Sequence, residues 1–145
     1  MSSLDENKGL YVLVFDLVED VCVEVGALGE FELAAGVYTY VGSAKQYLRQ
    51  RVERHMRPDK PTRWHIDYLT TCDASEPREA LLFGLEDVTE CGLSQRIGEC
   101  DASVAPIEGF GASDCEAGCE AHLWRVQDAA TLDGLGPATT LVAAG

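Results

Sequence analysis

Basic residues are concentrated in one short stretch of an acidic chain. The 145 residues include 11 Lys and Arg against 25 Asp and Glu, a formal net charge of −14. Seven of the 11 basic residues lie between positions 45 and 63, namely Lys45, Arg49, Arg51, Arg54, Arg57, Lys60 and Arg63. A local cationic surface suits an anionic partner, and the planar guanidinium of arginine can hold two phosphate oxygens at once. We therefore predict contact with phosphate. The alternative is a solvated helix face whose arginines pair with nearby acids.

The first third of the chain is predicted to form strands. Residues 10–17 are a continuous apolar run rich in β-branched and aromatic residues, which is typical of a buried strand. Residues 21–25 predict a second strand that pairs with the first as a hairpin, and residues 31–33 a short extended piece. Residues 37–41 predict a third clear strand, with Tyr38 and Tyr40 on one face.

The basic stretch is predicted to be a helix that follows the third strand. Between positions 44 and 57 the apolar residues Leu48, Val52 and Met56 recur every four positions, which is the spacing of a buried helical stripe. Pro58 ends this helix. Residues 64–69 fit either a helical turn or a strand.

Further along the chain, a polar break at 73–77 precedes a predicted strand at 80–85. A helix is predicted at 87–97 and a last strand at 122–126. Interleaved strands and helices predict one α+β domain with a small mixed β-sheet flanked by helices. This domain spans residues 9–127, between a flexible N-terminus (1–8) and a loose C-terminal tail (128–145).

Composition predicts a cytoplasmic protein with reduced thiols. No apolar run approaches the ~20 residues that cross a bilayer, and acids at the N-terminus do not suit a signal peptide. The six cysteines are therefore expected to be free and mostly buried. Cys115, Cys119 and His122, with Cys91, could bind structural zinc, but their spacing is unusual for zinc and favours plain thiols. The diffuse acidity fits either a halophilic surface or simple solubility.

Several short phrases resemble one known superfamily. Gly9-Leu10-Tyr11 opens the first strand, Tyr40-Val41-Gly42 closes the third, and Leu48, Arg51 and His55 follow on the helix. This order resembles the GIY-YIG nuclease superfamily. Other phrases resemble an uncharacterised GIY-YIG-like family, some of whose members are fused to endonuclease III; they are Tyr40-Val41-Gly42-Ser43-Ala44, Arg54-His55, Trp64-His65-Ile66-Asp67-Tyr68-Leu69, Glu90-Cys91 and Phe110-Gly111-Ala112-Ser113-Asp114-Cys115.

The resemblance implies a metal-dependent endonuclease that hydrolyses phosphodiester bonds, with DNA as the expected nucleic acid. It implies that Tyr11 and Tyr40 position or activate the nucleophile and that Arg51 contacts the phosphate. It also implies that Glu90 binds a divalent metal, Mg²⁺ or else Mn²⁺, for which a single carboxylate is suitable. His55 is a candidate proton shuttle. Association with a DNA-repair glycosylase or endonuclease III is a further implication.

One spacing departs from the superfamily. Here 28 residues separate Tyr11 from Tyr40, more than is usual, which predicts an extra β-hairpin at residues 21–33. The asparagine that usually completes the superfamily's active site has no clear counterpart, because Asn7 is the sole asparagine of the chain, and Ser113 or Asp114 is the candidate replacement.

Each candidate also has a structural interpretation. Tyr11 and Tyr40 could be core tyrosines, and Arg51 a charge on the helix flank. Glu90 could favour the first turn of a helix because of the helix dipole, and His55 could bond a backbone carbonyl. Two rival functions follow: a nucleic-acid-binding module that has lost cleavage, and a protein-interaction domain whose arginines meet an acidic partner.

Overall fold

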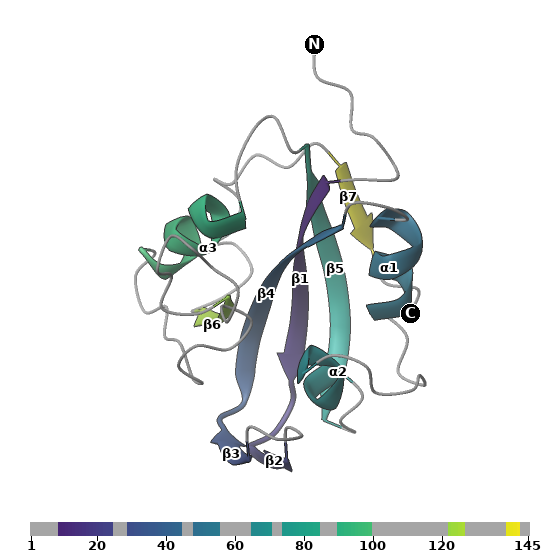
Figure 1. The fold of residues 1–145 in the computed structure, drawn as a ribbon. Helices are drawn as coiled ribbons and strands as arrows, with labels where there is room; N and C mark the ends of the chain where they lie inside the picture. The colour runs from purple at the N-terminus through teal and green to yellow at the C-terminus, as the bar shows by residue number, and fades with distance from the viewer. Residues whose placement is uncertain are drawn as a thin grey trace.

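The central element of the protein is β1 (Gly9–Leu17), as a computed structural model shows (Figure 1). The structure describes residues 9–24, 29–44, 48–55, 65–70, 74–84, 90–99, 122–126 and 139–142. Its other elements are β2 (Val21–Glu24), β3 (Glu30–Leu33), β4 (Gly36–Ala44), α1 (Leu48–His55), α2 (His65–Thr70), β5 (Ser75–Phe83), α3 (Glu90–Gly98), β6 (Leu123–Val126) and β7 (Thr139–Val142). The predicted α+β class is confirmed.

Five strands form one sheet in the order β6-β4-β1-β5-β7, and each described pairing in it is antiparallel. The prediction of a mixed sheet is wrong for these strands. The reason lies in the connection from β4 to β5 through α1 and α2. β4 and β5 run in the same direction, but they lie on either side of β1 and are therefore not neighbours.

The predicted hairpin between the first two strands is wrong as well. Both edges of β1 are occupied, by β4 and by β5, so β1 offers no free edge to β2. β2 instead pairs with β3 in a separate two-stranded antiparallel sheet. The segment between the two tyrosine strands thus carries a two-stranded ladder. That this ladder is an addition to the superfamily's fold stays a prediction.

Side chains of β1 alternate between two cores. Tyr11, Leu13, Phe15 and Leu17 join the core that also contains buried residues of α1 and α2. Leu10, Val12 and Val14 join the core that contains Leu93 and Ile97 of α3. The sheet is therefore a middle layer, with α1 and α2 covering one face and α3 the other. This alternation is what determines which site residues can meet.

The two helices that cover the tyrosine face of the sheet, α1 and α2, pack against it through short apolar stripes. Leu48 and Val52 of α1 are fully buried, as predicted from apolar residues that recur every four positions. Met56 lies outside the described residues. The segment that fitted helix or strand is the helix α2, which buries Ile66 and Leu69. Among the described helices, none is long and apolar enough to cross a membrane.

β5 begins earlier than predicted, inside the expected polar break. The register against β1 shifts between Val14 and Phe15, so that Glu79 opposes Val14 and Pro77 opposes Phe15. This β-bulge explains how the strand tolerates Pro77, because proline cannot donate to a ladder and is found at bulges and edges.

The expected loose tail also differs from the structure over one stretch. Thr139–Val142 forms β7, which pairs with the outer edge of β5. Strand pairing of this kind depends on a partner more than 50 positions away, and the short run Thr139-Thr140-Leu141-Val142 gives little local signal for it.

Candidate active site

Tyr11 and His55 form a buried pair between β1 and the end of α1. The hydroxyl oxygen of Tyr11 lies 3.2 Å from Nε2 of His55, and the ring centroids are 5.4 Å apart. Tyr11 is 4% exposed and His55 3%. A histidine nitrogen at this distance can accept the phenolic proton if the other ring nitrogen carries the imidazole hydrogen. The pair joins two residues predicted separately and 44 positions apart.

Gly42 makes room for the Tyr11 ring. The two residues are direct cross-strand partners in the β1–β4 ladder. A Cβ built at Gly42 would overlap the Cζ and the hydroxyl oxygen of Tyr11. A side chain at position 42 would therefore displace the ring that reaches His55.

Tyr40 lies beside Tyr11 on the same face of the sheet. Its ring centroid is 6.5 Å from that of Tyr11, and the two rings are tilted by 43°. Tyr40 is half-buried and packs against the core that contains Tyr11. The predicted alternation of β4 is confirmed, and the structure brings both tyrosines together.

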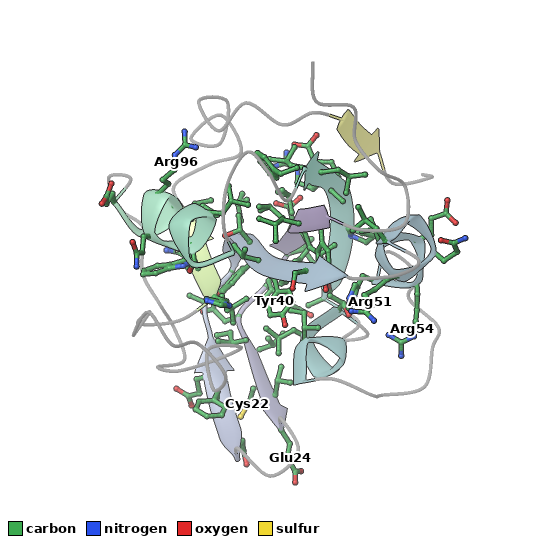
Figure 2. The ribbon with its side chains drawn as sticks, turned by 45° about the horizontal axis from the view of Figure 1, so that its top comes forward. Cys22, Glu24, Tyr40, Arg51, Arg54 and Arg96 are labelled. Carbon is green, nitrogen blue, oxygen red and sulfur yellow. The ribbon has the colours of Figure 1, made fainter. Side chains whose placement is uncertain are left out.

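Arg51 sits on α1 one turn before His55, at the end of β4. Its Nη1 donates a hydrogen bond of 3.1 Å to the backbone carbonyl of Ser43, the residue after Gly42. Figure 2 shows Tyr40 and Arg51 on the same side of the sheet, with Arg54 farther out on α1. Arg51 is half-buried, so one bond anchors the guanidinium while part of the side chain reaches solvent.

The remaining basic residues are described only in part. Arg54 is half-buried on α1, and the backbone of Arg49 belongs to the same helix. Four predicted phosphate contacts lie outside the described residues, namely Lys45, Arg57, Lys60 and Arg63. The clustering of the whole basic patch in space therefore stays a prediction.

Glu90 begins α3, and α3 packs against the opposite face of the sheet from the tyrosines. The side chain of Glu90 lies outside the description. Among the described residues, no three His, Cys, Asp or Glu side chains gather in a way that could hold a metal ion. The metal site predicted at Glu90 thus gains no ligand set from the part of the chain that the structure describes.

The residues of the alternative zinc site are also described only in part. Cys115 and Cys119 lie outside the described residues. His122 is 2% exposed, and its burial lowers the pKa of the imidazole. Its backbone carbonyl accepts a hydrogen bond from the amide of Val41, so His122 helps to connect β6 to β4.

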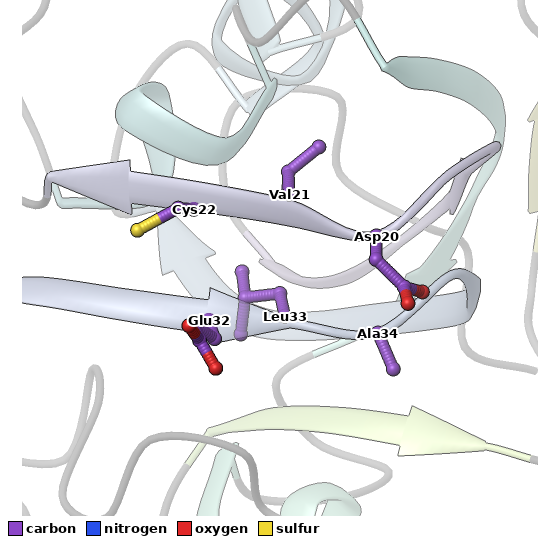
Figure 3. A pocket seen from close by; sticks show the side chains of 6 residues that line it. All are labelled: Asp20, Val21, Cys22, Glu32, Leu33 and Ala34. Atoms are coloured by element: carbon purple, nitrogen blue, oxygen red, sulfur yellow. The ribbon is translucent and has the colours of Figure 1, made fainter.

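A hollow of about 540 Å³ lies on the two-stranded sheet formed by β2 and β3 (Figure 3). Val21 faces Leu33 and Cys22 faces Glu32 across the ladder, and Asp20 and Ala34 complete the described lining. Carboxylates repel phosphate, so this hollow does not suit a nucleic-acid backbone. Cys22 is exposed, and the side chains of the other five cysteines lie outside the description, so the expectation of mostly buried thiols stays a prediction.

The sequence predicts which residues belong to the site but not the contacts that fix their side chains. It did not predict the Tyr11–His55 bond, the role of Gly42 or the Ser43 carbonyl. A signal for Gly42 existed, because alternation along β4 places position 42 on the same face as Tyr40. The register against β1 was needed to place it opposite Tyr11.

Comparison with known proteins gives one match. A family model described as "Domain of unknown function DUF123" matches residues 10–136. No curated protein and no solved structure matches the chain. The matched stretch includes both tyrosines, α1 and α3.

Proposed function

Because the chain belongs to the DUF123 family, which is GIY-YIG-like, we propose that it is an endonuclease that hydrolyses phosphodiester bonds in DNA. One observation carries the proposal. Tyr11, Tyr40 and His55 meet on one face of the sheet, and Arg51 is anchored at the end of the same strand that carries Tyr40.

Each of these residues has a distinct role in the proposed reaction. Arg51 holds the phosphate, because a guanidinium stays charged at any relevant pH and stabilises the charge that develops on phosphoryl oxygens. Tyr40, the more exposed tyrosine, orients the attacking water. Tyr11 relays the proton to His55, because a neutral imidazole nitrogen is a suitable proton acceptor.

The proposed hydrolysis consumes only one water molecule besides the DNA. The water oxygen forms the new P–O bond while the bond from phosphorus to the leaving ester oxygen breaks. The water proton passes to the Tyr11 oxygen as the Tyr11 proton moves to Nε2 of His55. The leaving oxygen takes a proton from solvent. His55 later passes its proton back to the Tyr11 oxygen, which releases a proton to solvent.

The nucleic-acid backbone would cross α1. Arg54 and Arg49, together with Lys45, Arg57, Lys60 and Arg63, would contact phosphates on either side of the scissile one. The acidic two-stranded sheet would repel the same backbone. Association with a DNA-repair glycosylase or endonuclease III remains a further proposal, based on the family resemblance.

The divalent metal is proposed separately. The resemblance implies Mg²⁺ or Mn²⁺ at Glu90, but the described residues do not supply its ligands. The proposed proton transfers use Tyr11 and His55 and involve no metal. Nicking with and without chelator decides whether the reaction requires one.

A second candidate is a nucleic-acid-binding module without cleavage. Its support is the burial of Tyr11, which at 4% exposure resembles a core tyrosine with a satisfied hydroxyl. In this case Arg51 and Arg54 would still bind phosphate.

The test is nicking of supercoiled plasmid with Mg²⁺, with Mn²⁺ and with chelator, at low and high salt. We expect Arg51→Ala and Tyr11→Phe to abolish nicking, and Glu90→Ala to do so if this residue binds metal. Arg96→Ala is the matched control, because Arg96 is an exposed arginine on α3, the helix of the other face (Figure 2). DNA binding without nicking by the wild type would favour the binding module. No binding at all would contradict both.

A further inference from the structure

A small cavity lies behind His55, between β1, β5 and the helices of the same face. Its polar lining comes from His55, Thr70, Ser75 and Glu79, and its apolar lining includes Leu13 and Phe15. The space open to the centre of a water molecule is about 10 Å³. That is about the least that one buried water requires, so there is room for one water and not for two.

The β-bulge adjoins this cavity, because Val14, Phe15 and Pro77 all line it. Where the register shifts between Val14 and Phe15, the ladder between β1 and β5 is locally interrupted. Pro77 opposes Phe15 and has no backbone N–H to donate. Buried waters in proteins usually bond polar groups that would otherwise be unsatisfied.

Ser75 needs a partner in this space. Its hydroxyl is buried and has no hydrogen-bond partner among the residues that the structure describes. Thr70 is 7% exposed, and its hydroxyl donates to the carbonyl of Ile66 at 3.3 Å, which leaves its oxygen able to accept. A buried hydroxyl left unsatisfied is costly, so a bridging water is favoured.

We propose that one buried water binds here and bridges Ser75, Thr70 and the Nδ1 edge of the His55 ring. The water accepts from Nδ1–H and donates to the two hydroxyl oxygens. With hydrogen on Nδ1, Nε2 of His55 is the acceptor for the Tyr11 hydroxyl 3.2 Å away. Ser75 and Thr70 are thus positioning residues, because they select the imidazole tautomer that receives the Tyr11 proton.

The water site follows from the cavity and its lining, whereas its effect on cleavage rests on the proposed function. NMR of the full chain with ¹⁵N-labelled histidine tests the first part. Ring ¹⁵N shifts report the tautomer, and cross-peaks to water report a long-lived water. We expect the Nδ1–H tautomer and a water cross-peak at His55. A wild type with the Nε2–H tautomer, or without the cross-peak, would overturn the proposal.

Variants connect the water to its two hydroxyls. Ser75→Ala and Thr70→Val should weaken or remove the cross-peak and mix the tautomers, while the backbone spectrum stays folded. Thr39→Val is the matched control, because Thr39 is also a buried hydroxyl but bonds the carbonyl of Trp124 on β6. It should leave the His55 ring signals unchanged, and equal effects of all three variants would sink the assignment.

Cleavage tests the second part independently. Ser75→Ala should lower the nicking rate roughly fivefold, the rate equivalent of one net hydrogen bond, with DNA affinity unchanged. If the wild type does not nick, the proposed function fails but the NMR result still decides the water site. If the water is present and Ser75→Ala nicks at the wild-type rate, the positioning role is wrong.

Discussion

The ring of Tyr11 occupies the space that a side chain at Gly42 would fill. The two residues face each other across β1 and β4, and a Cβ at position 42 would overlap the phenol's Cζ and oxygen. This relationship gives the glycine of the Tyr40-Val41-Gly42 phrase a physical role. It lets an aromatic ring lie over the neighbouring strand and reach His55 on α1.

Gly42→Ala should therefore destabilise the protein and separate Tyr11 from His55. Overpacking of this kind costs about 1–3 kcal/mol in unfolding free energy, measured by urea denaturation. In a Tyr11→Ala background the same substitution should cost much less, because the overlapping ring is gone.

Gly98→Ala is a matched control for activity. A Cβ at Gly98 would approach the Trp124 ring to 2.6 Å, on the opposite face of the sheet. It should lower stability to a similar extent but leave nicking intact below the melting temperature. If both variants lost nicking equally, Gly42 would have no special connection to the site.

The hydroxyl of Tyr11 should contribute to stability as well as to chemistry. Tyr11→Phe removes a buried hydrogen bond and should lower the unfolding free energy by about 0.5–1.5 kcal/mol. A double-mutant cycle with His55→Ala should give a coupling energy of about 1 kcal/mol. Tyr40→Phe is the control, because Tyr40 is half-buried and is not part of this bond. Additive effects of Tyr11→Phe and His55→Ala would contradict the bond.

Local patterns are enough to predict several elements. β1 is predictable because a continuous apolar run of that length suits a buried strand, and α1 because Leu48 and Val52 repeat at helical spacing. The partners of each strand are not predictable in this way. The hairpin expected between β1 and β2 does not form because β4 and β5 occupy both edges of β1, a fact that depends on the whole sheet.

The residues of the site can likewise be predicted from local patterns, whereas the contacts between them depend on the whole fold. The motif names Tyr11, Tyr40, Arg51 and His55, and the face of Tyr40 follows from alternation along its strand. The contact between Tyr11 and His55 requires the placement of α1 over the sheet, which no local pattern contains. The cavity at Ser75 adjoins the bulge in the β1–β5 ladder, whose register depends on strand pairing, although Pro77 is a local sign of an irregular strand.

Salt dependence should identify which arginines contact phosphate. Each phosphate contact releases counterions, so removing one contact to duplex DNA should change the slope of log affinity against log salt by about 0.9. Arg54→Ala should reduce the slope by about this amount, whereas Arg96→Ala on α3 should leave it unchanged. Binding titrations across a range of KCl concentrations provide the measurement. Equal slopes for wild type and Arg54→Ala would remove Arg54 from the interface.

The thiol of Cys22 should react slowly for an exposed cysteine. It donates a hydrogen bond of 2.6 Å to Oε1 of Glu30. The pKa of the Cys22 thiol is raised above its ordinary value. The largest cause is this hydrogen bond, followed by desolvation and then by the negative charges of Glu30 and Glu32. Because the thiolate is the reactive form, a raised pKa means a smaller reactive fraction at mildly alkaline pH.

Glu30→Gln should therefore speed alkylation of Cys22 by iodoacetamide, and the midpoint of the rate against pH should move to lower pH. A group whose pKa is raised by folding stabilises the folded state below its unfolded pKa, and this contribution is lost as pH rises through the folded pKa. The wild type should accordingly lose more stability than Glu30→Gln between neutral and alkaline pH. Glu19→Gln, which removes an exposed carboxylate that does not bond Cys22, should leave the alkylation rate unchanged. An equal rate in wild type and Glu30→Gln would show that the bond does not control this thiol.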